Sequence, residues 1–195
     1  MNLEGKCIGF CFTGSYCMFS KTIEQLKELS KIKDINITPI MSYNSYFLDS
    51  KFADAKDIIK EVEEITGNRI IHTIQDAEPI GPKKMFDILI VAPCSGNTIA
   101  KLAHDIIDTP ATMAVKSHLR NSRPVVIAIS TNNALSGAAE NIGRLLNRKN
   151  YYFVPVRQDN PITKPTSLVF DPKLVKKTLE EALEFNQIQP FFLWI

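Results

Sequence analysis

Apolar residues follow two alternating patterns along the chain. Five short and largely apolar runs predict buried β-strands, at residues 6–12, 36–41, 87–92, 125–130 and 151–156. Helical spacing of apolar residues, or a capping residue before such a run, predicts helices at residues 19–32, 52–65, 97–104, 110–119 and 136–147, and Asp171-Pro172 opens a last one. Gly67 follows the second helix as a C-cap, and Thr109 precedes the fourth as an N-cap.

The remaining segments are predicted to lack regular structure. Residues 42–49 form a polar loop with aromatic side chains, and residues 68–84 contain Pro79, Gly81 and Pro82. Residues 157–167 are rich in proline and are predicted to form another loop.

Strands that alternate with helices predict an α/β fold. The expected architecture is a doubly wound, mostly parallel sheet with right-handed crossovers and helices on both faces. At 195 residues the chain is long enough for one domain and too short for two ordinary ones, so residues 1–195 are expected to form a single domain. Residues from about 188 to 195 are expected to form a C-terminal extension.

One strand-to-helix junction carries the strongest chemical signal. The apolar run that ends at Val91 is followed by Pro93, which removes a backbone donor and is expected to stop the strand. Cys94, Ser95, Gly96, Asn97 and Thr98 then begin a helix, where the dipole and free N–H groups favour an anion. A capped turn without a ligand explains the same residues about as well.

The other strand ends carry similar side chains. In open α/β sheets ligands bind beyond the carboxyl ends of the strands, and hydroxyl or amide groups stand at each of these positions. The four other polar loops begin Thr13-Gly14-Ser15-Tyr16, Ser42-Tyr43-Asn44-Ser45, Ser130-Thr131-Asn132-Asn133 and Arg157-Gln158-Asp159-Asn160. A phosphorylated cofactor accounts for this set, although strand-end loops are polar in any α/β protein.

Common fingerprints of other sites are absent from the sequence. Gly9 and Gly14 lie too far apart for the dinucleotide motif, and no P-loop is present, so the expected cofactor is a mononucleotide. The three histidines lack metal-ligand spacing, and no metal is expected. Cys94 has no histidine partner nearby in sequence. Its place at a helix start would lower its pKa, so a nucleophilic role stays open beside the favoured role of a packed thiol.

Composition narrows the setting. A net charge of +2, without any long basic run, argues against a nucleic-acid partner. No apolar stretch approaches the roughly 20 residues of a membrane span, so no membrane association is expected. Four cysteines without a Cys-x-x-Cys pair indicate free thiols and a reducing cytoplasm.

At three strand ends the sequence resembles the homo-oligomeric flavin-containing cysteine decarboxylase family. The similar segments are Thr13-Gly14-Ser15, Ala92-Pro93-Cys94-Ser95-Gly96-Asn97-Thr98-Ile99-Ala100-Lys101 and Ser130-Thr131-Asn132-Asn133-Ala134-Leu135. The second is similar to the family's Pro-Ala-Ser-Ala-Asn-Thr signature and to its version in flavin prenyltransferases. The resemblance implies FMN as cofactor and trimers, or multiples of three, as assembly.

Two departures bear on the activity. The decarboxylases carry a histidine about where Pro79 stands here and a cysteine in a C-terminal flap, whereas no cysteine follows Cys94. Segments 78–82 and 158–167 resemble another branch of the family. Its members are flavoprotein subunits that work with a nicotinamide-binding subunit to oxidise dihydrodipicolinate to dipicolinate, in the mother cell of a sporulating bacterium.

Three functions therefore stay open: that oxidoreductase subunit, a flavin prenyltransferase or decarboxylase, and a non-catalytic flavin- or phosphate-binding scaffold. The expected cofactor-binding residues are Thr13, Gly14, Ser15, Ser42, Cys94, Ser95, Gly96, Asn97, Thr98, Ser130, Thr131 and Asn132. Within this set Gly14, Ser15 and Ser42 are expected to hold the phosphate, and residues 94–98 the ring. Asn133 and Arg157 are the catalytic candidates, and Arg157 and Lys164 are expected to meet a small dicarboxylate substrate.

Overall fold

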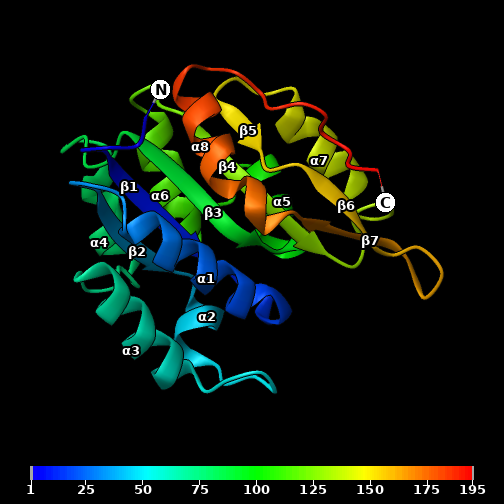
Figure 1. The fold of residues 1–195 in the computed structure, drawn as a ribbon, viewed down its shortest axis with the longest axis horizontal. Helices are drawn as coiled ribbons and strands as arrows, with labels where there is room; N and C mark the ends of the chain where they lie inside the picture. The colour runs from blue at the N-terminus through cyan, green and yellow to red at the C-terminus, as the bar shows by residue number, and fades with distance from the viewer. Residues whose placement is uncertain (1, 195) are drawn as a thin grey trace.

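A seven-stranded sheet forms the centre of the molecule in a computed structural model, which describes residues 2–194 (Figure 1). Four parallel strands run in the order β2 (Asn36–Met41), β1 (Cys7–Phe12), β3 (Ile88–Cys94) and β4 (Val125–Thr131). Beyond β4 the sheet divides. Parallel β5 (Tyr151–Phe153) pairs with the amino half of β4, and antiparallel β7 (Lys164–Phe170) pairs with its carboxyl end. The predicted doubly wound α/β fold is confirmed.

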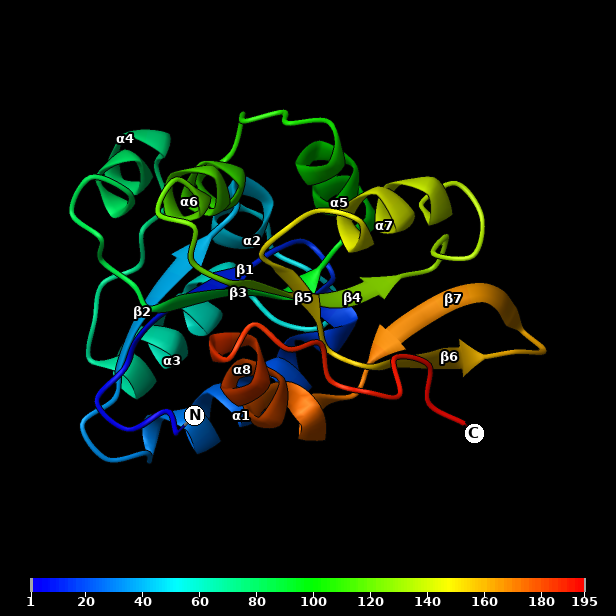
Figure 2. The ribbon, with the colours of Figure 1, turned by 90° about the horizontal axis from the view of Figure 1, so that it is seen from above.

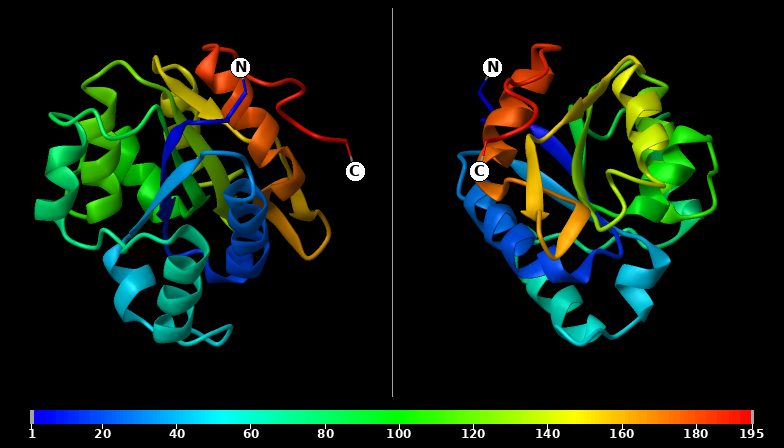
Figure 3. Two further views of the ribbon diagram at one scale, coloured as in Figure 1. Left: turned by 60° about the vertical axis from the view of Figure 1, so that its left-hand side comes forward. Right: turned by 90° about the vertical axis from the view of Figure 1, so that its right-hand side faces the viewer.

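Helices cover both faces of the sheet, as the views in Figures 2 and 3 show. One face packs against α1 (Phe19–Ser30), α3 (Ala55–Thr66) and α8 (Val175–Leu183). The other packs against α5 (Gly96–Ala103), α6 (Pro110–Leu119) and α7 (Ala139–Leu146). Along β3, Ile88 and Ile90 belong to the first core cluster, and Leu89 and Val91 to the second. This strand is therefore buried on both sides, as its unbroken apolar run predicts.

The expectation that Pro93 ends β3 is wrong. The strand continues to Cys94, which pairs with Ile129 of β4 after a shift of register between Val91 and Cys94. Proline is tolerated at such an irregularity because the local ladder does not need its missing N–H. The connection to α5 therefore begins only at Ser95.

The predicted loop at residues 157–167 is also wrong, because most of it is a β-hairpin. Strand β6 (Val156–Asn160) pairs with β7 in antiparallel register, and the hairpin extends the sheet beyond the carboxyl end of β4. Figure 1 shows it projecting from the edge farthest from β2.

Several smaller segments also differ from expectation. The predicted loop at residues 42–49 contains helix α2 (Tyr43–Phe47), which Ser42 caps by accepting a hydrogen bond from the Ser45 N–H. The irregular segment 68–84 contains α4 (Ile74–Ala77) and the 3-10 helix η2 (Glu78–Ile80). Two further 3-10 helices, η1 (Tyr16–Met18) and η3 (Pro172–Leu174), precede α1 and α8. Helices α3 and α7 begin three residues later than predicted, at residues 55 and 139.

The C-terminal segment returns to the start of β6. The Leu193 N–H donates to the Val156 carbonyl at 2.8 Å, and the Val156 N–H donates to the Phe191 carbonyl at 2.9 Å. An extension at residues 188–195 stays a prediction, and residue 195 lies outside the described residues. Within residues 2–194 no helix has the length and apolar character needed to cross a membrane.

Candidate functional site

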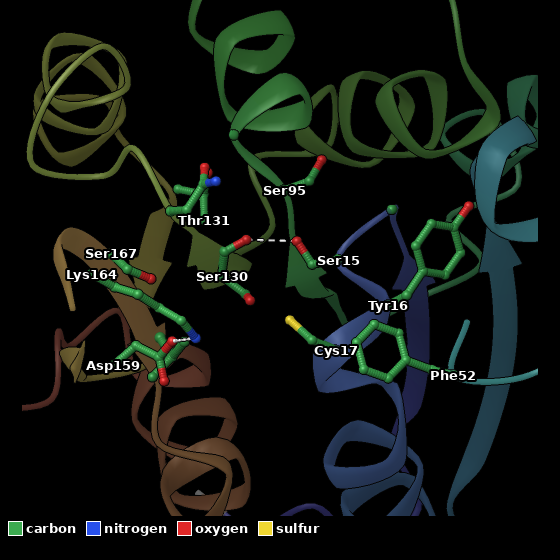
Figure 4. A pocket seen from close by; sticks show the side chains of 14 residues that line it. Ser15, Tyr16, Cys17, Phe52, Ser95, Ser130, Thr131, Asp159, Lys164 and Ser167 are labelled. Carbon is green, nitrogen blue, oxygen red and sulfur yellow. Dashed lines mark hydrogen bonds and ion pairs between the residues drawn. The ribbon is translucent and has the colours of Figure 1, made fainter. Parts of the chain in front are cut away.

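A cleft of about 440 Å³ lies at the carboxyl ends of β1, β3 and β4, and we call it the carboxyl-edge cleft (Figure 4). The carboxyl ends of the strands form its base. The β6–β7 hairpin forms one wall, and η1 together with Phe52 forms the other. Seven of the predicted cofactor residues line it: Gly14, Ser15, Ser95, Gly96, Ser130, Thr131 and Asn132. The structure therefore brings three strand ends, far apart in sequence, to one cavity.

A second cavity of about 320 Å³ adjoins the cleft, and Gly14 and Ser95 line both. It contains Ser42, Asn97 and Thr98 from the predicted set, together with Lys101, whose ammonium group contacts the Asp108 carboxylate at 2.7 Å. The residues predicted to bind the phosphate, Gly14, Ser15 and Ser42, are thus divided between the two cavities.

Thr13 ties the base together from below. Its side chain is fully buried, and its hydroxyl donates to the Pro93 carbonyl at 2.7 Å and accepts from the Ser95 N–H at 3.0 Å. The hydroxyl therefore joins the end of β1 to the loop that starts α5. This arrangement makes Thr13 a positioning residue for the cleft, because its polar atom is already occupied by the protein.

Helix α5 directs backbone donors toward the two cavities. Ser95 is its N-cap: the Ser95 hydroxyl accepts from the Thr98 N–H, and the Ser95 carbonyl accepts from the Ile99 N–H. The N–H groups of Gly96 and Asn97 have no carbonyl one turn earlier to bind, as at the start of any helix. Gly96 lines the cleft and Asn97 the second cavity, so each cavity has a donor on the positive end of the helix dipole.

The end of β4 and the loop that follows it approach Gly96 so closely that even a methyl group there would displace neighbouring side chains. A Cβ atom on Gly96 would lie 2.6 Å from Thr131 Oγ1 and 2.9 Å from Asn133 Oδ1. The Thr131 hydroxyl donates to the same Asn133 oxygen at 2.6 Å. Asn133, a catalytic candidate, is therefore held against the first turn of α5, beside the cleft.

The two predicted phosphate-binding hydroxyls already have partners in the protein. The Ser15 hydroxyl donates to the Ser130 carbonyl at 2.6 Å, which links the ends of β1 and β4. The Ser42 hydroxyl lies 2.8 Å from that of Ser45 and caps α2. A ligand anion would compete with these contacts, whereas backbone N–H groups and the side-chain amide of Asn97 remain as donors.

The thiol of Cys94 does not behave as its position at a helix start suggested. The side chain is fully buried in the core, and burial raises the pKa of the thiol well above its ordinary value. Removal from water disfavours the thiolate more than the helix dipole favours it. The expected lowering of the pKa is thus wrong, and Cys94 is a packed thiol.

Apart from Lys164, the residues of the walls were not among the predicted site residues. Asp159, Lys164, Ser167 and Val169 come from the hairpin, and Tyr16, Cys17 and Phe52 come from the opposite side (Figure 4). Lys164 was expected to meet the substrate, and the structure places it in the cleft. Its ammonium group contacts the Asp159 carboxylate, which raises the pKa of Lys164.

Arg157 faces elsewhere. It lines a separate cavity with Phe192 and Trp194, and its guanidinium lies 3.9 Å from the Asp171 carboxylate. The structure therefore brings Lys164, and not Arg157, to the carboxyl-edge cleft. Among residues 2–194, no group of three or more histidine, cysteine or acidic side chains is arranged to hold a metal ion.

Two dipicolinate synthase subunits match this chain over nearly its whole length. A subunit of the dipicolinate synthase of Bacillus subtilis (strain 168) is 39% identical over 192 residues, which cover 98% of this chain and 96% of the relative. The crystal structure of the same kind of dipicolinate synthase subunit from Bacillus halodurans is 39% identical with a TM-score of 0.90, and the match covers 100% of this chain and 99% of the other.

A more distant structure shares the fold. Burkholderia xenovorans DmrB, solved in complex with FMN, is 17% identical with a TM-score of 0.67 over 93% of this chain and 97% of the other. The model of the Flavoprotein family matches residues 1–176 of the sequence, so the predicted family is confirmed. The chain belongs to the Flavoprotein family.

Proposed function

We propose that this chain is the FMN-binding subunit of a dipicolinate synthase. Two relatives named as dipicolinate synthase subunits match it over nearly its whole length, and the family is that of flavoproteins. Because both relatives are subunits, we propose that this chain works with a second subunit. We propose that the second subunit binds the nicotinamide nucleotide, since this chain has no dinucleotide-binding fingerprint. We further propose that it acts in the mother-cell cytoplasm of a sporulating bacterium.

One observation carries the cofactor assignment, the close approach at Gly96. Because Gly96 has no Cβ, Thr131 and Asn133 pack directly against the first turn of α5, and this holds the N–H groups at the positive end of the helix beside the cleft. Amide and backbone donors line the two adjoining cavities, a set that suits the phosphate and the polar ring edge of FMN. Gly14, Gly96 and Asn97 would provide most of these contacts, while Thr13 and Ser95 hold them in position.

Bound FMN would supply an acceptor or donor of hydride beside a dicarboxylate substrate. The chain's own part is to bind and orient. The cleft base presents donors, and the hairpin wall presents the Lys164 ammonium for a substrate carboxylate. We also propose that the protein assembles as a homo-oligomer, as trimers or multiples of three, with residues 1–195 as one domain.

The test has two steps. The purified protein is expected to be yellow, or to bind added FMN with quenching of flavin fluorescence, and Asn97→Leu is expected to weaken that binding about tenfold, the cost of one lost buried hydrogen bond. Reconstitution with the nicotinamide-binding subunit and dihydrodipicolinate then follows nicotinamide reduction with and without FMN. Decarboxylation or prenyl transfer catalysed by this chain without the second subunit would instead favour a decarboxylase or a prenyltransferase. Absence of flavin binding would leave only a scaffold.

A further inference from the structure

Two of the residues that line the carboxyl-edge cleft carry a charge, Asp159 and Lys164. The other lining residues are neutral. The two charged side chains contact one another across the hairpin and point into the cleft (Figure 4). In this state the ammonium group is neutralised by a neighbour that belongs to the same wall.

The hairpin holds the backbone of both residues in place. At the turn, the Asn160 side-chain carbonyl accepts from the N–H groups of Ile162 at 3.0 Å and Thr163 at 2.9 Å. At its base, the Thr166 hydroxyl donates to the Asn132 carbonyl at 2.6 Å, and the Leu135 N–H donates to the Thr166 carbonyl at 3.0 Å. The hairpin is thus fastened to the cleft base, and a change of partner for Lys164 requires only rotation of its side chain.

The contact between Asp159 and Lys164 is weak enough to exchange. The side chain of Lys164 is 58% exposed and that of Asp159 is 34% exposed, so water screens their attraction. A carboxylate on a ligand held in the cleft would be removed from water to a greater degree, and its hydrogen bond to the ammonium group would be correspondingly stronger. The wall opposite, with Tyr16 and Phe52, offers aromatic surface to a planar ligand.

We propose that Lys164 is the carboxylate-binding residue of the cleft: it leaves Asp159 to bind one carboxylate of a small planar dicarboxylate, for which Asp159 is the built-in competitor. Asp159 holds the ammonium group over the cleft when no substrate is present. It also lowers the affinity for any anion, so only a ligand with additional contacts in the cleft displaces it. This inference rests on the proposed function.

Removing either member of the pair gives opposite results, which separates this role from a structural one. Protein loaded with FMN is titrated with dipicolinate, the stable product, by calorimetry at low ionic strength. Lys164→Met is expected to weaken binding about tenfold or more, because a charge-assisted hydrogen bond is lost. Asp159→Asn is expected to tighten it about threefold, because the competing anion is gone. Lys164→Arg should retain most of the affinity.

Lys173→Met is the matched control. Lys173 is another exposed lysine, in η3, and is not part of the cleft lining, so its loss is expected to change the affinity less than about twofold. The FMN affinity of every variant is measured separately by fluorescence. If Lys164→Met and Asp159→Asn change dipicolinate binding in the same direction, or leave it unchanged, the pair is only a brace for the hairpin and the proposal is wrong.

The two proposals fail in different ways. Wild-type protein that binds FMN but shows no heat with dipicolinate would overturn the role of Lys164 and leave the flavin assignment standing. Wild-type protein that binds no FMN would overturn the proposed function itself, and this inference with it.

Discussion

The two ends of the parallel strands use polar residues for different purposes. At the amino ends, His118 Nε2–H donates to the Pro124 carbonyl at 3.1 Å, the Cys7 N–H donates to the Asp87 carboxylate at 2.9 Å, and Arg123 donates to the Phe86 carbonyl. Each of these contacts provides a hydrogen-bond partner for a backbone group in a strand or just before one. Polar groups at this end therefore serve stability.

At the carboxyl ends polar groups form two tiers. The lower tier, with the buried Thr13, is satisfied within the protein, whereas the upper tier of Gly96, Asn97 and Lys164 faces cavities. The difference shows that not every hydroxyl group at a strand end contacts a ligand, because some only hold the backbone groups that line the cavities. Three variants test these roles of the polar groups at the two ends of the strands.

The largest effect is expected at Thr13. Thr13→Val leaves the Pro93 carbonyl and the Ser95 N–H without their partner in a buried setting, so the free energy of unfolding is expected to fall by about 4 kcal/mol. Thr22→Val is the matched control. Thr22 is equally buried but donates only one bond, to the Met18 carbonyl at 2.9 Å, and its loss should cost about 1 kcal/mol. Urea denaturation followed by circular dichroism measures both, and equal losses would contradict the positioning role.

The second effect concerns the amino ends and pH. Burial lowers the pKa of His118 to about 4, from an ordinary value of 6.5. Between pH 6.5 and pH 4, His118 is therefore protonated in the unfolded chain but neutral in the folded protein. Its contribution to the free energy of unfolding is fully present above pH 6.5 and is lost as the pH falls toward 4. The loss attributable to His118 is about 3 kcal/mol across that window.

His118→Gln tests the assignment, because glutamine donates a similar hydrogen bond but does not titrate. Urea denaturation at several values between about pH 7 and pH 4 should show a flatter decline for this variant than for the wild type. FMN affinity at neutral pH is expected to be unchanged, because His118 is not part of the lining of either cavity. A decline as steep as that of the wild type would assign the acid sensitivity to other groups.

The parallel half of the sheet was predictable from sequence, while its antiparallel end was not. Residues 88–91 are all apolar because both faces of β3 are covered, and β2 keeps buried apolar residues at Ile37, Ile40 and Met41, so both strands leave a clear pattern. In the hairpin, Arg157, Asp159 and Lys164 are charged and exposed, and Pro165 lies in β7, so the pattern resembles a loop. Pairing with β4 and the fastening at Thr166 make these residues strands, and such long-range contacts leave no local signal.

The candidate site divides in the same way. Strand ends that follow apolar runs identified the base of the cleft, including Ser95 and Thr131. The walls were missed because Asp159 and Ser167 reach the cleft only through the hairpin, and Phe52 only through the loop before α3. A sequence also shows which side chains can donate a hydrogen bond but not which acceptors lie near them in the fold. The bonds of Ser15 and Ser42 within the protein were therefore not predicted.

The smallest effect is expected at Gly96, where the upper tier meets the lower one. Gly96→Ala places a methyl group against Thr131 and Asn133, whose oxygen atoms must move by a few tenths of an ångström or more. We expect a loss of about 1 kcal/mol of stability from overpacking and about tenfold in FMN affinity. Gly143→Ala in α7 is the control, because nothing lies within 4 Å of the added methyl group and the helix should gain about 0.5 to 1 kcal/mol. Unchanged FMN affinity in Gly96→Ala would mean that the first turn of α5 does not contact the flavin.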